Sequence, residues 1–156
     1  MSERRLPRLK TVALWGLAGL FVVALTIQAI PYGRDHSNPP VRQEPAWDSQ
    51  QTRTLAVSAC FDCHSNQTRW PWYSNVAPAS WLIQRDVDEG RQRLNFSEWD
   101  RPQEHADHAA EQVQESEMPP SQYTLMHPGA RLSSTERQTL AQGFQTMFGM
   151  ETGGGD

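Results

Sequence analysis

The stretch from Cys60 to His64 constrains this chain most strongly, because its C-x-x-C-H spacing is the attachment signature of c-type haem. Two thiols one helical turn apart can each form a thioether to one vinyl group of the haem, and the histidine that follows can reach the iron. Cys60 and Cys63 are the only cysteines in the sequence, so a single haem would use both. We therefore predict helices wrapped around one large, flat cofactor.

Three other uses of Cys60 and Cys63 compete with this interpretation. A disulfide between them would close a loop too short to give much entropic stabilisation. A zinc site needs two further ligands, and the sequence has no second C-x-x-C and no H-x-x-x-H. A C-x-x-C redox centre is expected between a strand and a helix, whereas helical and loop signals surround this motif. The histidine next to the second cysteine is required only by the haem interpretation.

Residues 11–30 contain no charged side chain and are long enough to cross a membrane as one helix. At ~1.5 Å per residue the helix would span about 30 Å, the thickness of a bilayer core. The preceding residues 1–10 carry four basic side chains, and such a flank stays in the cytoplasm. We predict a single-pass inner-membrane anchor with the haem domain in the periplasm. A signal peptide cleaved after Ala29 is the alternative, although the apolar run is long and Ile27-Gln28-Ala29 is a poor cleavage site.

The part of the chain beyond this run is acidic. Setting aside Glu3 and the four basic residues of the flank leaves ten of 14 basic and seventeen of 18 acidic residues, a net charge of about −7. An acidic surface argues against nucleic acid as a partner and suits a basic or weakly docking redox partner protein, although solubility alone also explains it.

Four prolines within residues 31–47 predict an extended tether, because proline continues neither a helix nor a central strand. Residues 48–149 are predicted to form the haem-binding domain, and residues 150–156 a loose tail. Helices are expected from residue 50 into the haem motif, over residues 79–94, over residues 100–117 on the surface, and over residues 134–148 with a capping box of Ser133 and Glu136.

Three aromatic side chains, Trp70, Trp72 and Tyr73, crowd a proline-containing loop just after the motif. Such a loop in a polar protein needs something large and flat to cover. We predict that these rings bind the cofactor, by packing on the haem or by donating a hydrogen bond to a propionate. Ordinary core packing explains them equally well.

Met118-Pro119-Pro120 is predicted to be an extended strap, because proline fixes φ and removes a hydrogen-bond donor. A rigid strap can hold a thioether over the open face of a haem, and methionine opposite histidine raises the reduction potential. Met118 is therefore the predicted distal iron ligand, opposite His64. His127 is the alternative ligand, followed by Met126 or no protein ligand. Met118 could also have no role at the iron and simply fill a gap in the core.

His105 and His108 stand three residues apart in the polar segment 100–117. They could share a helix face and bind a metal, but without further ligands a solvated face is the simpler interpretation. A haem enzyme such as a peroxidase would need a distal acid-base group, for which these two histidines and His127 are the unplaced candidates.

Taken together, these segments resemble the small bacterial haem-binding domain family. The resemblance rests on IPYGRDHSNPP, on ACFDCHSNQTRWPWYSNVAPASWLIQRDVDEGRQRLNFSEW and on EMPPSQYTLMHPGARLSSTER. It implies one covalent haem c on Cys60, Cys63 and His64 in a membrane-attached periplasmic domain, with an all-α, cytochrome c-like fold. Met118-Pro119 and His127-Pro128 match recurring family features. The expected function is one-electron transfer, and a haem-based sensor with an open or His127-ligated sixth position is the alternative.

Overall fold

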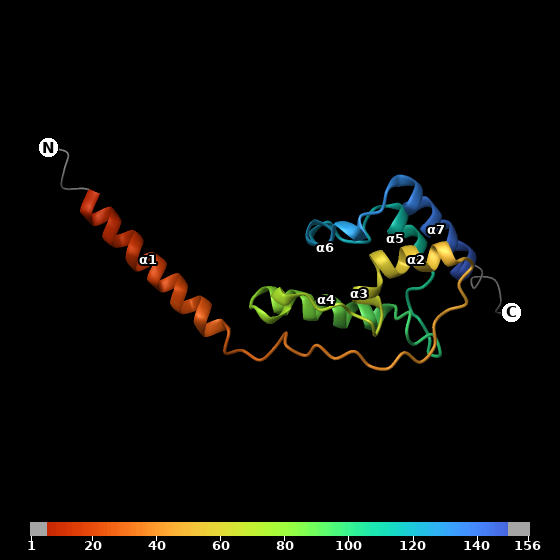
Figure 1. Ribbon diagram of the computed structural model, residues 1–156, viewed down its shortest axis with the longest axis horizontal. Coiled ribbons are helices and arrows are strands. Elements are labelled where there is room, and N and C mark those ends of the chain that lie inside the picture. The colour runs from red at the N-terminus through yellow and green to blue at the C-terminus, as the bar shows by residue number, and fades with distance from the viewer. Residues whose placement is uncertain (1–5, 150–156) are drawn as a thin grey trace. The chain divides into compact units, whose positions relative to one another are not determined.

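A computed structural model describes residues 6–149, and the regular elements within this range are helices (Figure 1). They are α1 (Leu6–Ile27), α2 (Gln50–Ala59), α3 (Phe61–His64), α4 (Ala79–Arg93), α5 (Ala109–Gln114), α6 (Ser121–Met126) and α7 (Ser134–Phe148), with two 3-10 turns at Trp72–Asn75 and Pro128–Ala130. Within the described range, pairing of extended backbone is limited to one isolated bridge between Gln43 and Glu98. The predicted all-α class is confirmed. The start of the basic flank at residues 1–5 and the tail at residues 150–156 lie outside the described residues.

The chain forms two compact units. The first comprises Met1–His36 and Pro71–Arg85, and the second comprises Ser37–Trp70 and Asp86–Asp156. The residues predicted as a tether have no helix, and from Ser37 onward they belong to the second unit. There Asn38 donates a hydrogen bond to the Thr68 carbonyl at 2.9 Å, so this part of the segment is packed and is not a free spacer.

In the first unit, α1 is an apolar helix whose residues Leu9–Ile27 have a mean hydropathy of 1.9. Its length and composition suit either a membrane anchor or a signal sequence. Just beyond it, the Gln28 side chain donates to the Ala77 carbonyl and accepts from the Ala77 N–H, both at 3.0 Å. Gly33, at φ +84°, lies so close to Ser80 that a Cβ would meet the Ser80 carbonyl carbon at 2.6 Å. The end of α1 is thus built into this unit.

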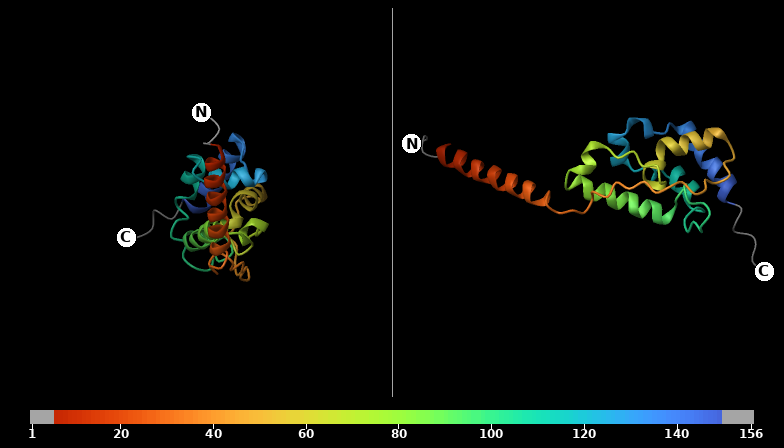
Figure 2. Two further views of the ribbon diagram at one scale, coloured as in Figure 1. Left: turned by 90° about the vertical axis from the view of Figure 1, so that its left-hand side faces the viewer. Right: turned by 60° about the horizontal axis from the view of Figure 1, so that its bottom comes forward.

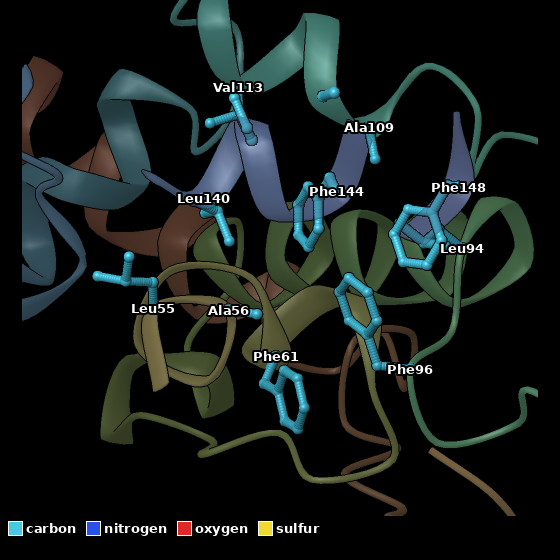
Figure 3. Packing of buried hydrophobic residues seen from close by; sticks show 12 residues of the cluster. Leu55, Ala56, Phe61, Leu94, Phe96, Ala109, Val113, Leu140, Phe144 and Phe148 are labelled. Carbon is cyan, nitrogen blue, oxygen red and sulfur yellow. The ribbon is translucent and has the colours of Figure 1, made fainter. Parts of the chain in front are cut away.

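In the second unit, α2, α5 and α7 enclose a hydrophobic core, and α5 lies beside α7 (Figures 1 and 2). Leu140, Phe144 and Phe148 form the buried stripe of α7 (Figure 3), as its three- and four-residue spacing predicts. Phe96 stacks on Phe61 at 5.5 Å and on Phe144 at 5.8 Å between ring centroids, which joins the haem motif to the core. The core members from the other elements are Leu55, Ala56, Leu94, Ala109, Ala110 and Val113.

The predicted ends of the helices hold except at the haem motif and over residues 100–117. The capping box of Ser133 and Glu136 is present at the start of α7, and Ser49 caps α2 by accepting a hydrogen bond from the Thr52 N–H. The helix predicted over residues 100–117 is wrong in length, because only α5 is helical there and turns precede it. Its buried face consists of Ala109, Ala110 and Val113, and Ser116 at φ 65° ends it. Residues 100–105 offer no apolar side chain that could dock a longer helix.

Candidate haem site

The C-x-x-C-H motif begins at Cys60, the residue between two helices. α2 ends there, and α3 contains the rest of the motif, so the predicted continuous helix is interrupted. The N–H groups of Cys63 and His64 both donate to the Cys60 carbonyl, at 3.1 and 2.9 Å. This turn places Cys60, Cys63 and His64 on the wall of one cavity. Both thiols are free and half-buried.

The imidazole of His64 is oriented by α4. Its Nδ1 lies 3.1 Å from the Gly90 carbonyl oxygen and 3.1 Å from the Leu94 carbonyl oxygen. Because carbonyls only accept hydrogen bonds, Nδ1 carries the proton and Nε2 keeps its lone pair. Burial lowers the pKa of His64, although the two backbone bonds oppose that shift. A neutral imidazole whose other nitrogen is held by a carbonyl is the usual arrangement of a metal-ligating histidine.

Gly90 explains how α4 comes close enough to orient His64. A Cβ at this position would lie 2.5 Å from the carbonyl oxygen of Cys63 and 3.0 Å from its carbonyl carbon. Glycine therefore permits the backbone of α4 to contact the backbone of the motif. A glycine within a helix can mark either a break or a close approach; here α4 continues through Gly90, which makes the close approach.

The two cysteines are uncharged in this setting. Burial raises the pKa of the Cys60 thiol to about 12, with a contribution from Cys63. Burial also raises the pKa of the Cys63 thiol to about 12, assisted by the negative charges of Asp86 and Asp62. Neutral thiols are compatible with a wall made largely of apolar groups.

The cavity has a volume of about 540 Å³, within the usual range for small-molecule and cofactor sites. The haem motif and the core supply Ala59, Cys60, Cys63, His64, Phe96 and Phe144, α4 and its end supply Asp86, Glu89, Gly90, Arg93 and Leu94, and the region of α5 supplies His105, His108, Ala109, Gln112 and Val113. The remaining wall is Met118, Pro119, Pro120, Gln122 and Tyr123. An apolar cavity that contains two thiols, a neutral imidazole and a thioether fits a haem.

Met118 reaches this cavity from the proline strap. Its N–H and that of Glu117 both donate to the Gln112 carbonyl at 3.0 Å, which ties the start of the strap to the end of α5. The Met118–Pro119 peptide is cis, and Pro120 continues in extended conformation before α6 begins. The segment is not helical, as its prolines predict, but the backbone bends at Met118 and Pro119, so the predicted strap is extended only at Pro120.

A buried carboxylate inside the motif connects the motif to α6, the helix that follows the strap. The Tyr123 hydroxyl donates to Asp62 Oδ2 at 2.7 Å, and the Asp62 side chain is only 8% exposed. The backbone N–H and the Nε–H of Arg69 donate to Asp62 Oδ1, both at 3.1 Å. Burial and the neighbouring Asp62 raise the pKa of Tyr123, so its hydroxyl remains a donor. Our sequence reasoning missed both Asp62 and Tyr123, although an acidic side chain within an otherwise apolar turn was an available signal.

Four other candidates, Trp70, Trp72, Tyr73 and His127, are not among the described residues that line the cavity. Trp70 is half-buried. His127 instead stacks on the Tyr123 ring at 4.2 Å, with its Nδ1 3.1 Å from the Tyr123 carbonyl oxygen. Trp72 and Tyr73 belong to the first unit, where their rings meet edge to face at 5.7 Å.

His105 and His108, for which a plain solvated face was expected, are exposed but also line the cavity. Their ring centroids are 6.3 Å apart. Within residues 6–149, no group of three or more His, Cys, Asp or Glu side chains is arranged to hold a separate metal ion. These two histidines are therefore groups on the rim or wall of the cofactor cavity.

The helical fold and this cavity define the class of the protein as an all-α haem-binding protein. The sequence profile of the haem-binding domain family matches residues 22–146, which is most of the chain, and the protein belongs to that family. The resemblance stated from the sequence is thereby confirmed, and haem is the ligand. No curated protein and no solved structure matches the chain.

Proposed function

We propose that this protein is a membrane-anchored c-type cytochrome, cytochrome c-like in fold, that carries single electrons on the periplasmic side of the inner membrane. The observation that supports this function best is the composition of one cavity wall: Cys60, Cys63, His64 and Met118 all line it. These are the groups that would attach a haem covalently and ligate its iron from two sides.

Cys60 and Cys63 would hold the haem through two thioethers. Each Sγ–H would add across one vinyl double bond, which would form an S–C bond and leave the thiol hydrogen on the neighbouring vinyl carbon, with no leaving group and no net oxidation. Separation under denaturing conditions tests this attachment. Haem should remain with the wild-type chain and leave a Cys60→Ser/Cys63→Ser variant, and haem lost from the wild type would contradict covalent attachment.

His64 and Met118 would be the proximal and distal ligands. When bound, the haem would supply a one-electron couple that an external donor reduces and an external acceptor protein oxidises. The Nδ1 contacts of His64 fix its ring and leave Nε2 available as a neutral ligand. The strap would hold the Met118 thioether in place, and a methionine ligand raises the potential into a range suited to electron transfer.

The distal assignment is tested by Met118→Ala, with Met126→Ala as the matched control. Met126 is exposed and is not among the described lining residues. Absorption and magnetic circular dichroism spectra of both oxidation states should show loss of the long-wavelength band of methionine-ligated ferric haem in Met118→Ala only, together with a lower reduction potential. An unchanged spectrum in Met118→Ala would contradict the assignment and direct attention to His105 and His108.

A haem-based ligand sensor is the second candidate function. It is favoured by the polar side chains of His105, His108 and Gln112, which line the same cavity and could donate a hydrogen bond to an external ligand. Rapid binding of carbon monoxide by the reduced wild-type protein would support the sensor. Slow binding that becomes rapid in Met118→Ala would support the electron carrier.

Retention of the anchor is supported by two features of the first unit. Gln28, one residue before the alternative cleavage point at Ala29, is paired with the backbone of Ala77. The match to the family begins at residue 22, inside α1. The N-terminal sequence and intact mass of the mature protein test this directly, and a chain that begins at residue 30 would overturn it.

A further inference from the structure

The first unit carries a tryptophan that is largely exposed. Trp72 is 78% exposed, whereas Trp47 and Trp99 are packed against the hydrophobic core of the second unit. A large aromatic side chain left in solvent is uncommon, since tryptophan is highly buried on average. Nearby exposed apolar residues of the same unit are Ile30, Tyr32 and Val76.

These exposed side chains lie next to the end of α1. Gln28 is the first strongly polar side chain after the apolar run, and its two hydrogen bonds reach Ala77, the residue after Val76. Ile30 follows Gln28 by two residues. The turn Trp72–Asn75 leads directly to Val76, whose N–H donates to the Tyr73 carbonyl at 3.1 Å. Trp72 precedes Ala77 by only a few residues, and successive Cα atoms are about 3.8 Å apart. Trp72 is therefore close to Gln28, the residue that follows the apolar helix and is bonded to Ala77.

A positive charge is fixed at the same point. The Arg34 guanidinium donates a hydrogen bond to the Gln28 carbonyl, and Arg34 is exposed. A guanidinium can use its remaining N–H groups on a phosphate, and arginine and tryptophan are both typical of the headgroup region of membranes. The end of α1 is therefore tied to a cation, Arg34, through Gln28, and to the segment that carries Trp72, through Ala77.

We propose that Trp72, Ile30, Tyr32, Val76 and Arg34 form an interfacial collar that binds the lipid headgroup region beside α1. Lipid is the occupant because the collar is tied through Gln28 to the end of α1, whose apolar side chains between Leu9 and Leu25 are exposed. The inference rests on the retained anchor of the proposed function. Its consequence is that the first unit is held against the membrane surface as well as being attached to it through α1.

Photocrosslinking of the full-length holoprotein in phosphatidylethanolamine and phosphatidylglycerol vesicles tests the collar. p-Benzoylphenylalanine is placed singly at Trp72, at Trp15 within α1, and at Leu125. The side chains of Trp72, Trp15 and Leu125 are all exposed, so the substitutions should not disturb folding. Leu125 measures how often an exposed apolar position reacts with lipid by collision. Lipid adducts are then identified by mass spectrometry after digestion.

The expected result is a high yield of lipid adducts with Trp72→p-benzoylphenylalanine, several-fold above the yield at Leu125, together with adducts at Trp15. Adducts at Trp15 without an excess at Trp72 would overturn the collar while leaving the anchor intact. Adducts at neither position would show that the anchor itself is wrong, and the collar with it. Adducts from Trp72 to a second protein chain in place of lipid would identify a protein-docking surface and also overturn the proposal.

Discussion

Replacing Tyr123 by phenylalanine should weaken the fold and loosen the strap, because the Tyr123 hydroxyl is the bond between α6 and the haem motif. It donates to Asp62 Oδ2 at 2.7 Å, and the carboxylate is almost fully buried. Phenylalanine keeps the ring and its stacking on His127 but removes the donor. The perturbation is therefore confined to the polar contacts of one hydroxyl group, which are the bond to Asp62 and an interaction with Arg69.

The cost follows from the charge and burial of the acceptor. A hydrogen bond to a charged group contributes about 1.5–3 kcal/mol, and Asp62 would keep its bonds from Arg69. We therefore expect Tyr123→Phe to lower the free energy of unfolding by about 2 kcal/mol, which for a chain of this size lowers Tm by roughly 4–8 °C.

Thermal and urea unfolding of the detergent-solubilised holoprotein measures this loss, with Tyr32→Phe as the control. Tyr32 is exposed, so removing its hydroxyl should change stability by less than about 0.5 kcal/mol. Because α6 follows the strap directly, Tyr123→Phe should also accelerate binding of imidazole to the ferric protein. A change as small as that of the control, with unaltered imidazole binding, would refute the role given to this hydrogen bond.

Three further predictions concern other parts of the fold. Gly90→Ala should be destabilising by about 1–2 kcal/mol in thermal unfolding, because the clash of its Cβ with the Cys63 carbonyl outweighs a gain of about 1 kcal/mol in helix propensity. Ser133→Ala should cost ~1 kcal/mol in urea unfolding through loss of the α7 cap. The hydrogen bonds from Arg53 lower the pKa of Glu44. The ionised Glu44 side chain therefore stabilises the folded protein above a pH of about 4, and this contribution is lost as the pH falls through the lowered pKa of the folded state. Stability curves from neutral to acidic pH should therefore fall more steeply for the wild type than for Glu44→Gln.

The features that the sequence predicted are those encoded by neighbouring residues. Ser133 and Glu136 are three residues apart, and the buried stripe of α7 repeats every three or four, so local spacing suffices to locate both. The haem motif is likewise continuous in sequence. The apolar run of α1 needed no more than its length and lack of charge.

The features that it missed depend on residues far apart in the chain. Asp62 and Tyr123 are 61 positions apart, and Gln28 and Ala77 are 49 apart, so no periodicity links either pair. One local inference also failed for a tertiary reason. The polar segment 100–117 forms only the short α5, because few of its side chains can be buried. His105 and His108 are exposed, as expected, but the turns before α5 also bring them to the cavity, which no local pattern indicates.

The pairing of Gln28 with Ala77 has a practical consequence for preparing this protein in water. Deleting everything up to Ala29 would remove a side chain that satisfies both backbone groups of Ala77, and would leave that loop without its support. Exchanging the exposed apolar residues of α1 for polar helix formers, with Gln28 kept, should give a soluble form whose first unit still folds. Substituting the surface of α1 is thus a better way to obtain a water-soluble protein than truncating the chain.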